Sequence, residues 1–331
     1  MKHKKIILFL SVICVFAIII FLQISVNSPK SIDGMNKSWM KDIPDEKKLS
    51  EITIPGAHNA AAATIPLSLF SKCQDYSISD LLNAGFRYLD IRAGVDEVDG
   101  EKTLFLYHNF ILCHTMDGLL PRNLTFADVT ATCYDFLASN PSETIIFMVK
   151  YEHGDASISE FEWLIEKEID KNSDKWLLTD KTPCLKQARG KIVLYRRYKD
   201  EACLGSKAGI ECIWDEQTNT DISDLNHIIT TCTENNILVQ DMYKLSADDK
   251  WTVFSRILNT SPQADNANEY YPTINFLSTT GQEFLGIPRY YATNLNARFM
   301  DYALDKEMNP QWIVVDFGDE KLAGRIIQAN F

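Results

Sequence analysis

The sequence predicts an irregular (β/α)8 barrel of the TIM type, preceded by an N-terminal apolar segment that acts as an anchor or a signal. Three observations support this fold. Short apolar runs of strand length alternate with helix signals along most of the chain. After the apolar segment about 300 residues remain, which suits one such barrel. Ionisable side chains also follow the strand-like runs, where barrel active sites lie.

Residues 1–28 are the first element and form a targeting segment. Three lysines precede the apolar run 6–26, which is long enough to cross a bilayer. The basic side stays in the cytoplasm, so the remainder is exported. Without a clear small-residue cleavage site, the pattern favours an uncleaved anchor over a signal peptide, although both remain open. We expect a protein anchored in the membrane and facing outside the cytoplasm, or one secreted after cleavage.

Residues 29–48 are polar with mixed charge and are interpreted as a stalk, and 49–331 as a single barrel domain. Runs rich in Ile, Val, Phe and Tyr predict the strands of this domain. We expect strands at 50–54, 86–91, 103–107, 144–150, 191–196, 237–241, 273–278 and 312–316. Only the interval between the second and third strands has the character of a loop and not of a helix.

Helix signals lie between most of these strands. A Ser or Thr followed three residues later by Asp is typical of a helix start, and Gly or Asn-Pro is typical of its end. This pattern predicts helices that begin at Ser77, Thr125 and Ser246, the first ending at Gly85 and the second near Asn140.

The bulk charge and the cysteines exclude some classes of protein and leave others open. A net charge of −12 argues against a nucleic-acid partner. Seven cysteines follow the apolar segment, without CxxC or zinc-finger spacing, and export permits disulfides. A Cys203–Cys212 bond and a set of buried free thiols are equally compatible with the sequence.

Polar and ionisable residues at the strand ends form one candidate site, because the carboxyl ends of barrel strands meet at one mouth. Asp90 and Arg92 are two residues apart on a strand and therefore share a face. The complete set is His58, Asp90, Arg92, His108, Lys150, Arg197, Asp241, Tyr243 and Asp316.

This set suits cleavage of a phosphodiester by an internal hydroxyl nucleophile. One histidine takes the hydroxyl proton and the other gives a proton to the leaving oxygen, roles that suit an imidazole near neutral pH. An arginine binds the phosphate and stabilises its developing charge. A carboxylate behind a histidine fixes its tautomer.

Several ordered motifs resemble the catalytic X region of phosphatidylinositol-specific phospholipase C, from about residue 38 to the C terminus. They are Ile54-Pro55-Gly56-Ala57-His58-Asn59, Phe86-Arg87-Tyr88-Leu89-Asp90-Ile91-Arg92, Leu106-Tyr107-His108, Asn140-Pro141-Ser142-Glu143-Thr144-Ile145-Ile146, Gly190-Lys191-Ile192-Val193-Leu194 and Val239-Gln240-Asp241-Met242-Tyr243. The resemblance implies an irregular (β/α)8 barrel that cleaves an inositol phospholipid into diacylglycerol and a cyclic inositol phosphate.

The resemblance also implies a role for each matching residue. His58 matches the general base for the inositol 2-hydroxyl, Asp316 its supporting carboxylate, and His108 the general acid. Arg92 matches the phosphate-binding arginine and Asp90 the acid that precedes it. The inositol-binding positions are matched by Lys150, Arg197, Asp241 and Tyr243. Two rivals remain, Arg196 for the role of Arg197 and His114 for that of His108.

Asn59 departs from the bacterial pattern, which usually has Asp after the first histidine as a partner of the general acid. Asn at this position also occurs in calcium-dependent relatives, where it helps bind the metal. Those enzymes need a carboxylate where this chain has Arg92, and a guanidinium there repels calcium. We therefore expect no metal and no cofactor.

A second resemblance widens the substrate class. His58-Asn59-Ala60, Cys73-Gln74 and the stretch 85–90 look like the branch that cleaves glycosylphosphatidylinositol. The sequence leaves open a catalytically weak or inactive barrel that binds inositol lipids or glycans. A glycerophosphodiester phosphodiesterase is disfavoured, because His-Arg-Gly and Glu-x-Asp are missing at the matching places. We expect a monomer whose partner is an inositol phospholipid in a membrane.

Overall fold

The computed structural model describes residues 32–115, 121–232, 235–259, 271–282, 286–302 and 308–331. The predicted targeting segment, residues 1–28, therefore lies outside the described residues. Among the helices of the described residues, none is long and apolar enough to span a bilayer. The strands are β1 (Ile54–Ala57), β2 (Tyr88–Val98), β3 (Glu101–His108), β4 (Ile111–Leu112), β5 (His114–Thr115), β6 (Arg122–Asn123), β7 (Ile145–His153), β8 (Trp176–Leu177), β9 (Ile192–Arg196), β10 (Ile210–Glu211), β11 (Thr230–Cys232), β12 (Ile237–Gln240), β13 (Thr273–Phe276) and β14 (Trp312–Val315).

One 12-stranded sheet curls into the barrel, and the predicted α/β barrel is confirmed. Its main path runs β10-β9-β7-β2-β1-β14-β13-β12-β11, parallel except for the antiparallel β11. Within the described residues β10 and β11 are the two edges of this path and do not pair with each other. The barrel is therefore irregular and open at this seam.

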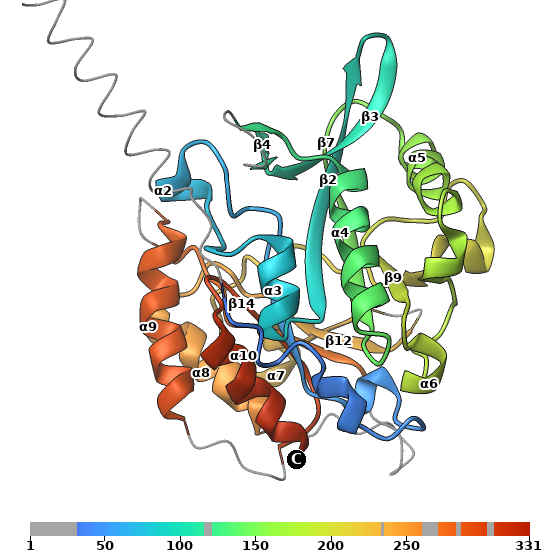
Figure 1. Cartoon of the computed structure of the whole chain (residues 1–331). Coiled ribbons are helices and arrows are strands. Elements are labelled where there is room, and N and C mark those ends of the chain that lie inside the picture. Colours follow the sequence, from blue (N-terminus) through green and yellow to red (C-terminus); the bar gives the residue numbers. More distant parts are fainter. Residues whose placement is uncertain (1–31, 116–120, 233–234, 260–270, 283–285, 303–307) are drawn as a thin grey trace, which may run out of the picture.

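The predicted strand 103–107 exists as β3, but it is not one of the parallel barrel strands. It pairs antiparallel with the far half of β2, from Ala93 to Val98. Figure 1 shows this hairpin projecting beyond the end of the barrel. The expectation of a loop between these two strands is wrong, because most of that interval is the far half of β2 and only the turn at Asp99-Gly100 separates β2 from β3. A tight hairpin explains why no helix signal lies between the two strands.

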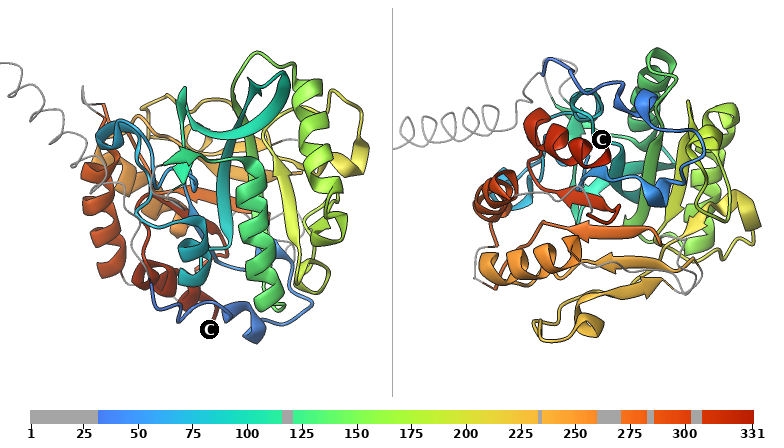
Figure 2. Two further views of the ribbon diagram at one scale, coloured as in Figure 1. Left: turned by 45° about the horizontal axis from the view of Figure 1, so that its top comes forward. Right: turned by 90° about the horizontal axis from the view of Figure 1, so that it is seen from below.

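Helices surround the sheet on its outer side (Figure 2). They are α2 (Ser68–Ser71), α3 (Ile78–Ala84), α4 (Phe126–Ser139), α5 (Ile158–Asp170), α6 (Leu185–Ala188), α7 (Leu225–Ile228), α8 (Ala247–Leu258), α9 (Pro288–Asp301) and α10 (Glu320–Ile327). The three predicted starts are confirmed, because the hydroxyls of Ser77, Thr125 and Ser246 accept hydrogen bonds from the backbone N–H three residues later. Gly85, with a φ of 114°, ends α3.

The strand pleat divides the core in two. Alternate residues such as Leu89 and Phe147 pack outward against the helices, whereas Tyr88, Met148 and Trp312 pack inside the barrel. Gly56 is required in this interior, since a Cβ there would lie 2.9 Å from Val314 Cγ2. The same period of two places polar residues beyond the strand ends on the inner face.

The segment interpreted as a stalk, residues 29–48, differs from that expectation in its described part. Trp39, Met40 and Ile43 are buried in the inner core cluster, and the Trp39 indole donates a hydrogen bond to the carbonyl of Gly85 at 3.0 Å. The polar composition of the segment suggested a stalk, although these three apolar side chains anchor it to the barrel. Residues 32–48 therefore pack on the barrel and do not form a free linker.

The predicted Cys203–Cys212 bond is wrong, and the alternative of free thiols describes the cysteines outside residues 1–31. Cys203 is exposed, while Cys212 is buried. The Cys212 sulfur lies 3.5 Å from that of Cys232. Proximity in sequence was therefore a poor guide, because the thiol nearest to Cys212 is that of Cys232, across the open seam of the barrel.

Candidate active site

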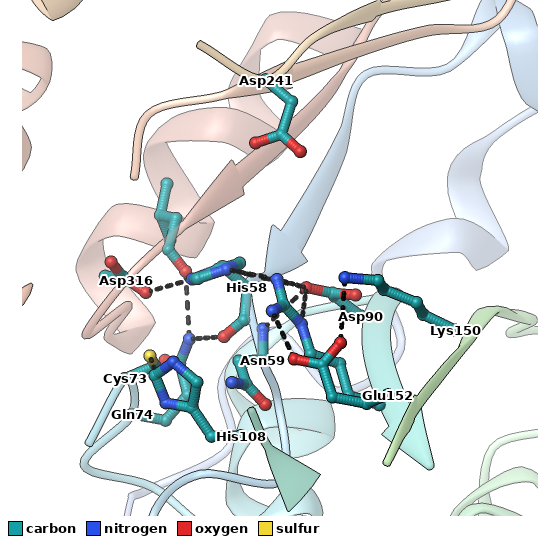
Figure 3. Close-up of polar contacts among 12 residues, drawn as sticks. His58, Asn59, Cys73, Gln74, Asp90, His108, Lys150, Glu152, Asp241 and Asp316 are labelled. Carbon is teal, nitrogen blue, oxygen red and sulfur yellow. Dashed lines mark hydrogen bonds and ion pairs between the residues drawn. The ribbon is translucent and has the colours of Figure 1, made fainter. Parts of the chain in front are cut away.

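A cavity of about 360 Å³ lies at the carboxyl ends of the barrel strands. It is lined by most of the predicted site residues, namely His58, Arg92, His108, Lys150, Arg197, Asp241, Tyr243 and Asp316. The remaining two, Asn59 and Asp90, are buried beside it. Figure 3 shows how the side chains of His58, Lys150 and Asp316 converge from different strands.

His58 follows β1 and is held between a carboxylate and a guanidinium. Its Nδ1 lies 2.7 Å from Asp316 Oδ1, and its Nε2 lies 2.9 Å from an Arg92 nitrogen. Because the guanidinium can only donate, Nε2 is the acceptor and Nδ1 carries the proton that Asp316 accepts. This is the tautomer that a general base requires.

The backbone around His58 is fixed as well. The amide of Gln74 donates to the carbonyl of His58 at 2.7 Å and to that of Val315 at 3.0 Å. The His58 N–H donates to the Val315 carbonyl at 3.0 Å. These bonds tie β1 to β14 at the point where His58 and Asp316 leave their strands, so the pair has a defined geometry.

Arg92 is held by two carboxylates. One of its terminal nitrogens lies 3.3 Å from Asp90 Oδ2 and the other 3.1 Å from Glu152 Oε1. Burial opposes the charged form of Arg92, but Asp90 and Glu152 raise its pKa above the usual value. Burial likewise raises the pKa of both carboxyls, yet the nearby cations lower each to about 2. Asp90, Arg92 and Glu152 are therefore all charged at neutral pH.

His108 ends β3 and has a different kind of partner. Its Nδ1 lies 2.6 Å from the carbonyl oxygen of Ser71, so Nδ1 donates and Nε2 is left for proton transfer. Burial and the Arg92 cation lower the pKa of His108 to about 4, against the opposing effect of the Ser71 carbonyl.

Asn59 makes its contacts through the backbone. It has a left-handed φ of 43°, and its N–H donates to Asp90 Oδ2 at 3.1 Å. Its side-chain oxygen and nitrogen are buried without a hydrogen-bond partner in the described part of the chain. The backbone N–H of Asn59 thus helps to hold Asp90. The partner of His108, which was expected to be the residue after His58, is instead the carbonyl of Ser71.

The opposite wall of the cavity carries the predicted inositol-binding residues. The Arg197 guanidinium stacks on the Trp214 ring at 3.4 Å, and the Trp214 indole donates to Asp241 Oδ2 at 3.1 Å. Tyr243 donates to Glu216 Oε2 at 2.6 Å. This wall therefore places hydrogen-bond donors and acceptors around the Trp214 ring.

Neither of the two rivals lines this cavity. Arg196 is buried on the other side of β9, where it pairs with Glu211 at 2.8 Å. The strand pleat separates it from Arg197, which resolves the register of the Arg-Arg doublet. His114 lies in β5 and pairs with β6, lining a separate cavity with Arg122 and Asp128.

Sequence reasoning missed three residues of the site. Glu152 joins Arg92 to Lys150, whose ammonium lies 2.9 Å from Glu152 Oε2. Its position two residues after Lys150 on the same strand was an available signal. Trp214 and Glu216 lie in an irregular segment after β10 and had no sequence signal of comparable strength.

Comparison with known proteins shows a similarity to one family of enzymes. Residues 46–198 match the family model "Phosphatidylinositol-specific phospholipase C, X domain". A 1-phosphatidylinositol phosphodiesterase of Listeria monocytogenes is 28% identical over 92% of this chain and 88% of its own length. The enzyme of that name from Staphylococcus aureus strain Newman is 24% identical over 92% of this chain and 98% of its own length.

Solved structures have the same fold. The phosphatidylinositol-specific phospholipase C from Listeria monocytogenes superposes with a TM-score of 0.68 at 25% identity, covering 89% of this chain and 99% of that chain. A mutant of the enzyme from Staphylococcus aureus superposes with a TM-score of 0.71 at 23% identity, covering 91% and 100%. Residues 46–198 therefore resemble the X domain of phosphatidylinositol-specific phospholipase C.

Proposed function

We propose that the chain is a metal-independent phospholipase C that cleaves phosphatidylinositol into diacylglycerol and a cyclic inositol phosphate. The observation that carries the proposal is the pair of histidines on one cavity wall, one oriented as a base and the other with Nε2 left for proton donation. The relatives named 1-phosphatidylinositol phosphodiesterase support it.

In the first half of the reaction, His58 Nε2 takes the proton of the inositol 2-hydroxyl. The hydroxyl oxygen then forms a bond to phosphorus, while Asp316 supports the imidazolium that results. The Arg92 nitrogen now 2.9 Å from His58 Nε2 turns to the phosphate oxygens when substrate enters. Asp90 and Glu152 keep the guanidinium in place as charge develops there.

In the second half, the bond between phosphorus and the glycerol oxygen breaks, and His108 Nε2 gives its proton to that oxygen. Diacylglycerol leaves and the cyclic phosphate remains. The low pKa of His108 in the free protein makes it a strong acid once protonated. The negative charge of the bound phosphodiester offsets the effect of Arg92 and favours the protonated form.

The opposite wall holds the inositol ring. The Asp241 carboxylate accepts hydrogen bonds from ring hydroxyls, and Lys150 and Arg197 donate to them. Tyr243 adds an aromatic face and a hydroxyl. These residues fit bare inositol and leave room for a glycosylated ring as the alternative substrate.

The lipid approaches at α2, where apolar side chains are exposed at the mouth of the cavity. Leu67, Leu69 and Phe70 are 60%, 58% and 46% exposed, and Phe70 also lines the cavity. Exposed apolar groups beside a polar site fit a membrane substrate. The expected location is outside the cytoplasm, with the protein secreted or anchored, and a monomer is expected to suffice.

Calcium has no place in this mechanism, because Arg92 supplies the positive charge that a metal would otherwise bring. A headgroup panel assayed with calcium or with EDTA tests the proposal. We expect inositol phosphate release from phosphatidylinositol in both conditions and none from phosphatidylcholine. Turnover of a glycosylphosphatidylinositol-anchored protein widens the substrate class, whereas binding without turnover on either inositol lipid overturns the proposal in favour of an inactive barrel.

A further inference from the structure

One thiol of the cavity has no part in the reaction above. Cys73 lies in the loop before α3, is only 1% exposed and lines the cavity. Its sulfur lies 3.9 Å from His108 Nδ1. The donor atoms of His58, Cys73 and Asp316 all lie within 4.8 Å of one another.

We propose that His58, Cys73 and Asp316 form an inhibitory site for zinc or a similar thiophilic divalent cation. The donor set is one imidazole nitrogen, one sulfur and one carboxylate oxygen, which is a zinc set and not a calcium set. Three protein ligands leave the fourth position to a water molecule in the cavity.

The spacing of the donors is close to what tetrahedral zinc needs. Zinc bonds of 2.0–2.3 Å place tetrahedral ligands about 3.3–3.8 Å apart. His58 Nδ1 and Asp316 Oδ1 are closer, at 2.7 Å, and the other donor distances are at most 4.8 Å. Side-chain shifts of about 1 Å therefore suffice to complete the site.

The charges around the site favour a cation. Arg92 lies on the Nε2 side of His58, while Asp316 lies on the Nδ1 side where zinc would bind. Arg92 is also neutralised by Asp90 and Glu152. The metal therefore faces the Asp316 carboxylate and the Cys73 sulfur, with the guanidinium on the Nε2 side of the imidazole ring.

Coordination releases one proton from the Cys73 thiol to solvent and moves the single ring proton of His58 to Nε2. The contact between Nε2 and Arg92 must then open, because both groups would be donors. This cost keeps the expected affinity in the micromolar range. It also explains the inhibition, since the bound metal occupies His58 and Asp316 and leaves Nε2 unable to accept a proton.

The inhibitory consequence rests on the proposed phospholipase activity, but metal binding does not. Binding is therefore measured first, on substrate-free protein, by titration with cobalt(II). We expect the charge-transfer absorption of a thiolate–cobalt bond in wild type and in Cys133→Ser, and its loss in Cys73→Ser. Cys133 is a matched control, because it is a buried thiol in the outer helix α4.

Activity is then assayed against zinc concentration. At about 10 μM zinc we expect at least a tenfold loss in wild type and Cys133→Ser, reversed by EDTA. Cys73→Ser should keep its activity without zinc within about twofold and lose the inhibition. Equal inhibition of Cys73→Ser, zinc activation of wild type, or absence of the cobalt–thiolate band would each overturn the proposal.

Discussion

Two arginines five residues apart in the same segment, Arg87 and Arg92, have opposite surroundings. Arg87 lies just before β2 and is fully buried. It donates to Glu143 and to the carbonyls of Lys37, Leu82 and Phe86. Arg92 lies near the carboxyl end of the barrel, paired with two carboxylates and facing the cavity.

The difference separates a cation used by the fold from the cation that we propose acts on the substrate. Every nitrogen of Arg87 is used by the fold, and its carboxylate partner also accepts from the N–H of Met40 at 3.1 Å, which ties the N-terminal segment to the barrel floor. Arg92 is held as firmly, but one of its donors points at His58 and can turn to a substrate. Asp90 and Glu152 fix the position of Arg92, and the donor that contacts His58 remains available on the cavity side.

The largest effect is expected at the structural arginine. Glu143→Gln leaves the Arg87 cation buried without an ionic partner, which lowers the free energy of unfolding by about 3–5 kcal/mol. Urea denaturation measures this loss. The double variant Arg87→Met/Glu143→Met is the control and should recover part of the loss. A loss of activity without a loss of stability in Glu143→Gln would reverse the assignment.

At Arg92, the arginine proposed to bind the phosphate, the expected effect is on the rate of catalysis. Arg92→Lys keeps the charge but loses the planar fork that spans Asp90, Glu152 and the phosphate. We expect kcat to fall by about 10²–10³-fold and the urea midpoint to remain near wild type. A midpoint shift as large as that of Glu143→Gln, with activity retained, would contradict the comparison.

Burial and the Arg92 cation also lower the stability of the folded protein at low pH, through their effect on His108. Together with burial, Arg92 lowers the pKa of His108 to about 4 in the folded protein, below the unfolded value of about 6.5. The unfolded state therefore binds the extra proton first, and stability is lost as the pH falls from about 6.5 to about 4. The loss reaches up to about 3 kcal/mol.

His108→Gln has no titrating group at this position, so its stability should decline less than that of wild type over the same range. Chemical denaturation at several pH values between these limits makes the comparison. Parallel stability profiles for the two proteins would show that His108 does not titrate as described.

The smallest effect is expected at the second carboxylate of Arg92. Glu152→Gln removes the charge that joins Arg92 to Lys150, while Asp90 still holds the guanidinium. We expect kcat to fall by about tenfold with KM nearly unchanged, because Glu152 positions a group that acts in the transition state. Rescue by Glu152→Asp would support positioning by charge, and a rise in KM alone would contradict it.

The sequence predicted much of this fold because the local signals were strong. The caps at Ser77, Thr125 and Ser246 start helices, and apolar runs become the barrel strands. It failed where long-range pairing decides the outcome. The predicted barrel strand 103–107 is one arm of a hairpin. The sulfur of Cys212 contacts that of Cys232 across the open seam of the barrel, and not that of Cys203.

The candidate site was predictable wherever a residue follows a strand, because the pleat and the barrel then fix its direction. This held for His58, Asp241 and Asp316, and the pleat also separates Arg197 from Arg196. Glu152 had the same signal and was overlooked. The Ser71 carbonyl that orients His108 carries no sequence signal at all, because a backbone oxygen is present at every residue.

The central claim is that two histidines and an arginine cleave an inositol phospholipid without a metal. It is tested most directly by phosphorus NMR of the products formed from phosphatidylinositol vesicles in EDTA. The account predicts a cyclic phosphodiester as the first product of wild type, and a loss of at least about 10³-fold in its rate of formation in His58→Ala. A strict requirement for calcium, or a phosphomonoester formed without the cyclic product, would contradict it.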